Sequence, residues 1–197
     1  DVFNMINFVP FSDESLARVF GTIMEWHLSK GFNMTVKQQC TAIVDATISI
    51  YNSIAENLLP TPTKVHYTFN LRDMSKVVQG ILQGQPQNVR EKADIIRMWA
   101  HESLRVFHDR LIHVQDRQWF TTLLSTVSSE KFSIEWSSVC PTSQGLLYGN
   151  FSDPRAVTKV YQSMNDWIQL KNIMHAYLED YNATSSKPMN LVLFENA

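Results

Sequence analysis

The chain has 197 residues, 44% hydrophobic and 11% aromatic, so it can bury a core and does not have the composition of a disordered segment. Its 17 basic and 19 acidic residues are intermixed and leave a net charge of −2, which argues against a broad nucleic-acid or membrane surface. No apolar run approaches the roughly 20 residues needed to span a bilayer. The first ten residues lack the basic segment and cleavage site of a signal peptide, and the missing initial Met suggests a piece excised from a longer chain.

Two cysteines and three glycosylation sequons bear on the compartment. Cys40 and Cys140 are best interpreted as reduced thiols, because two cysteines make no disulfide framework. Without a signal peptide, the sequons at Asn33, Asn150 and Asn182 are interpreted as chance matches. The sequence therefore favours an intracellular protein.

The N-terminal part predicts a strand and then a helix. Residues 2–9 alternate apolar and polar side chains, which is typical of a strand, and Pro10 closes it. Such a strand has no sheet to join in this chain. Ser12 caps a helix with acidic residues in its first turn, and Gly31 is a plausible stop. The expected core face of this helix comprises Leu16, Val19, Phe20, Ile23, Trp26 and His27.

Two further helices are predicted before residue 85. The first runs from about Thr35 to Leu59 and ends before two prolines, which cannot continue a helix. The second begins after Asn70, a good N-cap that can form a capping box with Asp73, and stops at Gly84. Its core face is set by apolar residues at helical spacing, namely Leu71, Met74, Val77, Val78 and Ile81.

A second capping box, Asn88 with Glu91, predicts a long helix to about Val114. Residues 119–127 predict another helical segment. Short loops join these five helical stretches, and short helix–helix loops favour antiparallel neighbours, so residues 11–127 are expected to form a helical bundle.

Residues 128–155 are rich in Ser, Gly and Pro, which predicts a linker and a domain boundary. After it, Pro154 opens an expected helix to about Met164, and a second helix begins at Asp166. Residues 182–188 are a polar connection, and residues 191–194 form a short apolar run that could be a strand fragment.

Arg72 is the residue with the clearest functional potential. It lies in the first turn of the helix that Asn70 caps and points off its apolar face, where the helix N-terminus already favours anions. A guanidinium can bind phosphate oxygens in a bidentate manner. The alternative is structural, because Arg72 could pair with Asp73 or another exposed carboxylate.

Four ordered segments resemble one family, the dynein heavy chains, and most closely the axonemal ones. Residues 66–80 resemble the second-sensor helix of the third AAA+ module, and residues 98–111, MWAHESLRVFHDRL, resemble the next helix of the same lid. Residues 11–16 are similar to the entry into the lid, and residues 177–194 to the approach to the fourth module. Together these matches cover nearly the whole chain in the right order.

The resemblance implies a mainly α-helical fold: an AAA+ small (lid) helical bundle, a linker, and a helix leading into the next module. It divides the chain into the last core strand of the third module (1–10), the lid (11–127), a linker (128–155) and the N-terminal part of the fourth module (156–197). It also implies that Arg72 senses ATP in the third site, flanked by Asn70 and Leu71, and relays conformational change for ATP-driven movement along microtubules.

The same resemblance implies cofactors and partners for the full-length parent. These are ATP or ADP with Mg²⁺, the neighbouring AAA+ modules, microtubules, and dynein light and intermediate chains, in the cytoplasm and cytoskeleton and in the cilium axoneme. No nucleic acid or membrane partner is expected, and no cofactor for this chain by itself.

Other motifs give no catalytic constellation. His101-Glu102 begins a zinc-protease pattern, but its fifth position is Arg105 rather than His. His101, His108 and His113 are too widely spaced on a helix for one Zn²⁺, and Glu102, Arg105, Asp109 and Arg110 suit intrahelical ion pairs. The sequence contains no G-x-x-x-x-G-K-[ST] phosphate loop, so we expect no ATP hydrolysis by this chain alone.

A function from another class remains open at this point. The chain could be a stand-alone helical module that binds a peptide helix in an apolar groove. The two hypotheses differ at Arg72, which a nucleotide sensor needs exposed and an interaction module could bury in a salt bridge.

Overall fold

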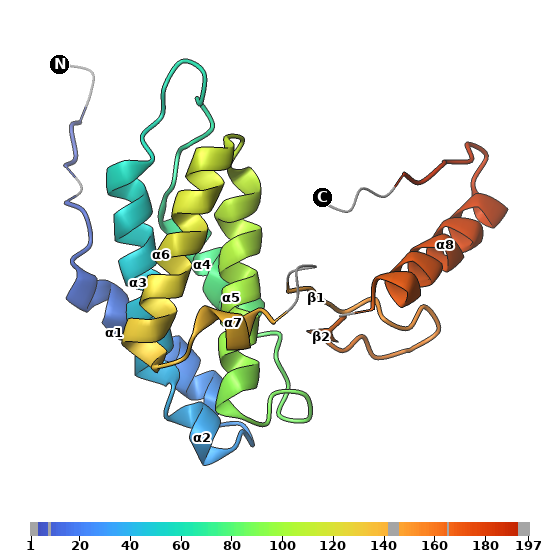
Figure 1. Ribbon diagram of the computed structural model, residues 1–197, viewed down its shortest axis with the longest axis horizontal. Helices are drawn as coiled ribbons and strands as arrows, with labels where there is room; N and C mark the ends of the chain where they lie inside the picture. The colour runs from blue at the N-terminus through green and yellow to red at the C-terminus, as the bar shows by residue number, and fades with distance from the viewer. Residues whose placement is uncertain (1–3, 8, 142–145, 165, 193–197) are drawn as a thin grey trace.

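A computed structural model describes residues 4–7, 9–141, 146–164 and 166–192. Its main body is a helical bundle, and a small hairpin and the last helix lie to one side of it (Figure 1). The predicted mainly α-helical class is confirmed. The elements are α1 (Asp13–Leu28), α2 (Met34–Lys37), α3 (Cys40–Asn57), α4 (Leu71–Ile81), α5 (Lys92–Val106), η1 (His108–Arg110), α6 (Val114–Phe132), α7 (Trp136–Val139), β1 (Tyr148–Gly149), β2 (Gln162–Ser163) and α8 (Trp167–Thr184).

Helix α1 begins where the sequence indicates, because the Ser12 side chain accepts the backbone N–H of Ser15. The face that it buries differs from the predicted one. Residues four apart point into the core, while Val19, Ile23 and Trp26 are exposed, Trp26 by 62%. The buried residues are Leu16, Phe20, Met24 and Leu28. The prediction was right for Leu16 and Phe20, wrong for Val19, Ile23 and Trp26, and did not include Met24 and Leu28.

The predicted helix from Thr35 to Leu59 is interrupted at residues 38–39. The backbone N–H of Gln39 bonds to Val36 at 3.0 Å, so the turn is tighter than α-helical and separates α2 from α3. Helix α2 lies against α1 and α5, and α3 lies against α1, α4, α5 and α6.

The helix predicted to reach Val114 also ends early and starts late. Its capping box is formed by Glu91 and Asp94 rather than Asn88 and Glu91, and α5 ends at Val106. The chain then turns through η1, which places Leu111 in the core at 1% exposure. Helix α6 continues to Phe132, into the segment predicted as linker, and ends where Ser133 adopts a left-handed conformation, φ 54°.

Helices α3 and α5 cross in the centre of the bundle. The Trp99 indole is fully buried and donates to the hydroxyl of Thr47 at 3.0 Å, also a buried side chain. Phe132 packs edge-on against the same indole, with ring centroids 5.0 Å apart. Other large side chains that are fully buried in the bundle include Tyr67, Phe107, Phe120, Met24, Ile50 and Met74.

The helix predicted over residues 154–164 is not formed. Strands β1 and β2 instead pair antiparallel, with Tyr148 opposite Ser163 and Gly149 opposite Gln162. The backbone N–H of Met164 extends the pairing with a 2.8 Å bond to Leu147. Val157, Thr158 and Val160 are β-branched and favour extended backbone over helix, which explains the difference.

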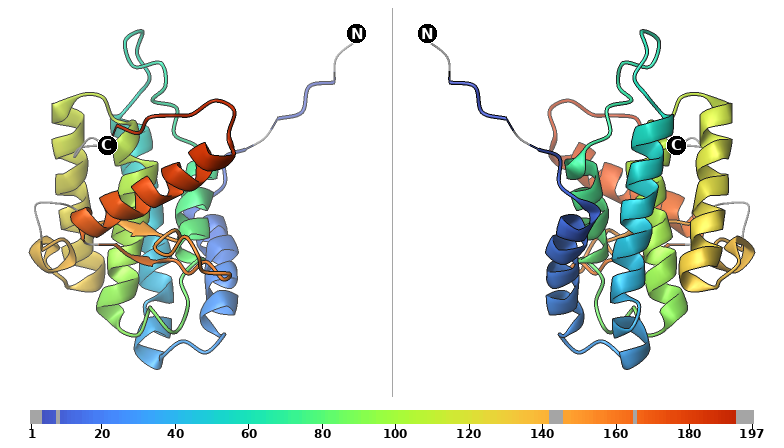
Figure 2. Two further views of the ribbon diagram at one scale, coloured as in Figure 1. Left: turned by 90° about the vertical axis from the view of Figure 1, so that its right-hand side faces the viewer. Right: turned by 90° about the vertical axis from the view of Figure 1, so that its left-hand side faces the viewer.

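Neither predicted terminal strand is paired in the part that the structure describes. Residues 4–7 and 9–10 are exposed and irregular, and they extend away from the bundle (Figure 2). Leu191 and Val192 are likewise unpaired, and the rest of both predictions, residues 2, 3, 8, 193 and 194, lies outside the described residues. Helix α8 begins at the predicted place, where Asp166 accepts the N–H groups of Ile168 and Gln169, and continues to Thr184.

Candidate functional site

The N-terminus of α4 is organised by its own sequence. The Asn70 side chain accepts the Arg72 backbone N–H at 2.9 Å, and the Asp73 carboxylate accepts the Asn70 N–H at 3.1 Å. The predicted capping box is confirmed. Leu71 is half-buried against the core, so the first turn is held on one side by packing and on the other by the cap.

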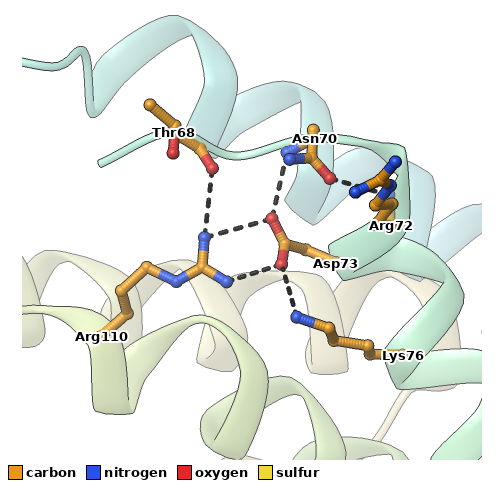
Figure 3. Close-up of polar contacts among 6 residues, drawn as sticks. All are labelled: Thr68, Asn70, Arg72, Asp73, Lys76 and Arg110. Atoms are coloured by element: carbon orange, nitrogen blue, oxygen red, sulfur yellow. Dashed lines mark hydrogen bonds and ion pairs between the residues drawn. The ribbon is translucent and has the colours of Figure 1, made fainter. Parts of the chain in front are cut away.

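Arg72 is exposed in this first turn, on the side away from the core (Figure 3). Its guanidinium has no hydrogen bond or ion pair with any residue of the described part of the chain. A cationic group at a helix N-terminus is intrinsically unfavourable, because the backbone N–H groups there carry partial positive charge. The same arrangement favours an anion that meets both the guanidinium and the helix end.

Asp73, the nearest carboxylate in sequence, is occupied by other partners. Its two oxygens accept a bidentate pair from Arg110, at 2.5 and 3.1 Å, and Lys76 approaches at 3.4 Å (Figure 3). Arg110 also donates to the Thr68 carbonyl at 3.2 Å, so it ties η1 to both the loop before α4 and the helix itself. The alternative in which Arg72 pairs with Asp73 is therefore wrong.

The charge state of Asp73 follows from these contacts. Burial alone would raise the pKa of this 3% exposed carboxyl, but the bonds from Arg110 and from the Asn70 N–H outweigh burial and lower the pKa below its ordinary value. The carboxylate is ionised at neutral pH and neutralises Arg110. At this end of the helix, Arg110 is neutralised by Asp73, whereas the Arg72 cation faces solvent.

Sequence reasoning missed the role of Arg110. The i, i+4 spacing suggested intrahelical pairs among Glu102, Arg105, Asp109 and Arg110, and only Glu102 with Arg105 is formed in that way, at 2.6 Å. Arg110 lies in η1 and reaches α4 instead. The missed signal was the break after Val106, since a continuous helix would have pointed Arg110 along α5.

The described residues contain no group of three His, Cys, Asp or Glu side chains placed to hold a metal ion. His101, His108 and His113 serve separate contacts; His101, for example, bonds to the Leu146 carbonyl at 3.0 Å. Neither Cys40 nor Cys140 is in a disulfide. None of the helices described here combines the length and the apolar character that crossing a bilayer requires.

A hollow of about 500 Å³ opens between α1, α3 and α6. Its lining includes four carboxylates, Asp13, Glu14, Asp45 and Glu56, and two apolar side chains, Ala17 and Ile48. A groove for the apolar face of a peptide helix needs hydrophobic anchoring positions. This hollow offers Ala17 and Ile48, whereas a second one of about 520 Å³ is lined by Val89, Met98, Leu146, Tyr148 and Tyr161 among others.

Comparison with known proteins identifies the bundle. Residues 43–136 match the family described as AAA+ lid domain. Over 99% of its length the chain is 38% identical to mouse dynein axonemal heavy chain 1 and 40% identical to human dynein axonemal heavy chain 6, and over 98% it is 38% identical to human dynein axonemal heavy chain 3. It spans about 5% of the length of each of these relatives. The chain therefore belongs to the axonemal dynein heavy chain family and contains an AAA+ lid domain.

Proposed function

We propose that Arg72 is a nucleotide sensor: the second-sensor arginine that reaches the phosphates of ATP bound in the third AAA+ module of the parent motor. The observation that carries this proposal is the exposed guanidinium of Arg72, unpaired within the described residues, beside an Asp73 whose oxygens are already taken. A structural arginine would be expected to use such a carboxylate. Asn70 and Leu71 would flank Arg72 at the nucleotide, and Asn70 also caps the turn that carries it.

The chain would then comprise the lid of the third module and the beginning of the fourth. We place the lid at α1 to α7, with the hairpin and α8 leading onward, and residues 1–10 as the end of the preceding core. The phosphate loop and the Mg²⁺-binding carboxylates would lie elsewhere in the parent, since the 197 residues contain no such loop. On this proposal the chain does not hydrolyse ATP by itself.

The mechanical part of the proposal is a relay. Helix α4 packs along α5 and is tied to η1 by Asp73 and Arg110, so a pull on Arg72 would move a connected body rather than one side chain. Presence or absence of the γ-phosphate would bias the lid between two orientations, which is the minimum required for allosteric coupling. In the parent this would contribute to ATP-driven movement along microtubules in the axoneme, together with neighbouring modules and dynein light and intermediate chains.

The test is ATP affinity measured by calorimetry on this chain and on a longer chain that includes the preceding phosphate loop. We expect the longer chain alone to bind, and Arg72→Ala to weaken its binding about 10- to 150-fold, corresponding to about 1.5–3 kcal/mol for a hydrogen bond to a charged group. Arg18→Ala is the matched control, because Arg18 is also an exposed helical arginine without a side-chain partner among the described residues.

If the longer chain binds ATP equally well with and without Arg72→Ala, the sensor assignment is refuted. Equal losses for Arg72→Ala and Arg18→Ala would refute it as well, since they would reflect overall charge rather than a contact at the helix end.

A further inference from the structure

A buried carboxylate lies where α4, α5 and the hairpin meet. Glu102 of α5 is 0% exposed, and its Oε2 accepts two bonds from Arg105, at 3.0 Å from Nε and 2.6 Å from Nη2. Its Oε1 accepts the hydroxyl of Tyr161, which immediately precedes β2 and is itself buried. A charge removed from water in this way is strongly destabilising unless its partners stay in place.

Helix α4 approaches the same carboxylate through Gly80. A Cβ on Gly80 would lie 2.0 Å from Glu102 Oε2 and 2.7 Å from its Cγ, so the carboxylate occupies the space that any side chain on this turn would fill. The helix that presents Arg72 at its first turn thus touches Glu102 near its last turn. Glu102 is in direct contact with the sensor helix on one side and with the hairpin on the other.

Aromatic packing surrounds this contact. The His101 ring lies 5.4 Å from the ring of Tyr148 and 6.5 Å from that of Tyr161, and its Nδ1 donates to the Leu146 carbonyl. Burial lowers the pKa of His101, in spite of the nearby Glu102 charge, so the ring is neutral at physiological pH. The hairpin is therefore held on α5 by the Tyr161 bond to Glu102, by the His101 bond to Leu146, and by tilted packing of Tyr148 and Tyr161 on the His101 ring.

We propose that Glu102 is a rigid joint, that is, a fixed attachment point between the β1–β2 hairpin and the lid. The hairpin then moves with α4 and α5 rather than as a flexible linker. The fixing itself is independent of nucleotide. Its use in relaying lid motion to the chain after the hairpin rests on the proposed function, and would make Glu102 a positioning residue for that relay.

Residue-resolved hydrogen exchange on this chain, without nucleotide, tests the joint. Tyr161→Phe removes only the hydroxyl that Glu102 accepts, and we expect the Met164 amide, which bonds to Leu147, to exchange at least about tenfold faster, equivalent to about 1.4 kcal/mol. Amides in the middle of α3 serve as an internal reference and should change less than about twofold, because in the described part of the chain no hydrogen bond joins α3 to Glu102 or Tyr161.

Tyr148→Phe is the matched control. Tyr148 lies in the same hairpin and packs on the same His101 ring, but its hydroxyl has no hydrogen-bond partner in the described part of the chain. We expect it to leave the Met164 amide within about twofold of the parent chain. Similar effects of the two substitutions, no effect of Tyr161→Phe, or equal acceleration in α3 would each overturn the proposal. None of these outcomes bears on ATP affinity, so failure of the joint and failure of the Arg72 assignment can be told apart.

Discussion

At the scale of single residues, the contrast between Arg72 and Arg110 decides how the α4 terminus is interpreted. Both are arginines near one buried carboxylate, yet only Arg110 is paired with it. Arg110 is 24% exposed at its side chain and is the structural member of the pair, whereas Arg72 faces solvent. Substituting the two residues should therefore separate stability from nucleotide binding.

The Asp73–Arg110 pair gives a pH-dependent prediction. Asp73→Asn should lower the free energy of unfolding at pH 7 by about 2–4 kcal/mol, because Arg110 is left partly buried without its counter-charge. Since the folded pKa of Asp73 is lowered, its contribution is fully present above the unfolded value near 3.9 and is lost as pH falls through the folded value. The difference between the two proteins should therefore shrink below about pH 4 in urea titrations.

Asp109→Asn provides the comparison for that experiment. Asp109 is one residue away from Arg110 and its side chain is 67% exposed, so we expect a change within about 0.5 kcal/mol at pH 7. A loss as large as that of Asp73→Asn would mean that net charge, rather than the buried pair, sets the effect.

At the scale of elements, α4 and α5 depend on a close approach that only glycine permits. Gly80→Ala would place a methyl group against the Glu102 carboxylate, which cannot retreat without breaking its bonds to Arg105 and Tyr161. We expect a loss of about 1–3 kcal/mol in thermal or urea unfolding, in the range of overpacked cores.

Gly21→Ala is the opposite case in the same fold. Gly21 lies within α1, and a Cβ there would meet nothing within 4 Å. Alanine should stabilise the helix by up to about 1 kcal/mol, through the backbone entropy that glycine loses on folding. Two substitutions of identical chemistry should thus differ in sign, and equal signs would contradict the tight Glu102–Gly80 contact.

Local signals in the sequence predicted where these helices begin better than they predicted how long the helices are. The α4 capping box and the Asp166 cap of α8 involve residues within four positions of one another, so the sequence alone was sufficient. The turn after Val106 instead places Arg110 against Asp73, a partner distant in sequence. For the same reason the exposure of Arg72 was predictable, whereas the partner of Asp73 was not.

The hairpin shows the same limit. Asp153-Pro154 is an ordinary helix start, and its sequence favoured a helix to Met164. The β-branched Val157, Thr158 and Val160 oppose that helix, and the buried Tyr161 hydroxyl finds its acceptor 59 residues away on α5. No local pattern could indicate that partner.

At the scale of the whole molecule, two parts differ in how many of their side chains are buried. The helical bundle with its hairpin buries many, whereas helix α8 buries few. Leu170 is the buried residue of α8, and the Lys159 ammonium donates to the Tyr177 hydroxyl at an exposed position, 3.0 Å away. A chain ending at Met164 should therefore keep its melting temperature within about 3 °C, which corresponds to less than about 1 kcal/mol for this size.

A chain ending at Val139 is the control, because it also removes Tyr161 and leaves the Glu102 carboxylate without that donor. We expect its melting temperature to fall by more than twice as much. Equal melting temperatures for the two shortened chains would mean that the hairpin adds nothing to the lid.

The crossing of α3 and α5 has an optical consequence. Trp99 is sealed from water, with its one N–H donated to Thr47, whereas Trp26 lies largely in solvent. An indole in an apolar, rigid surrounding emits at shorter wavelengths than one in water, so Trp99 is a fluorophore that reports on this crossing. With the other four tryptophans replaced by Phe, its emission would follow in real time whether the centre of the lid stays closed while its edges move.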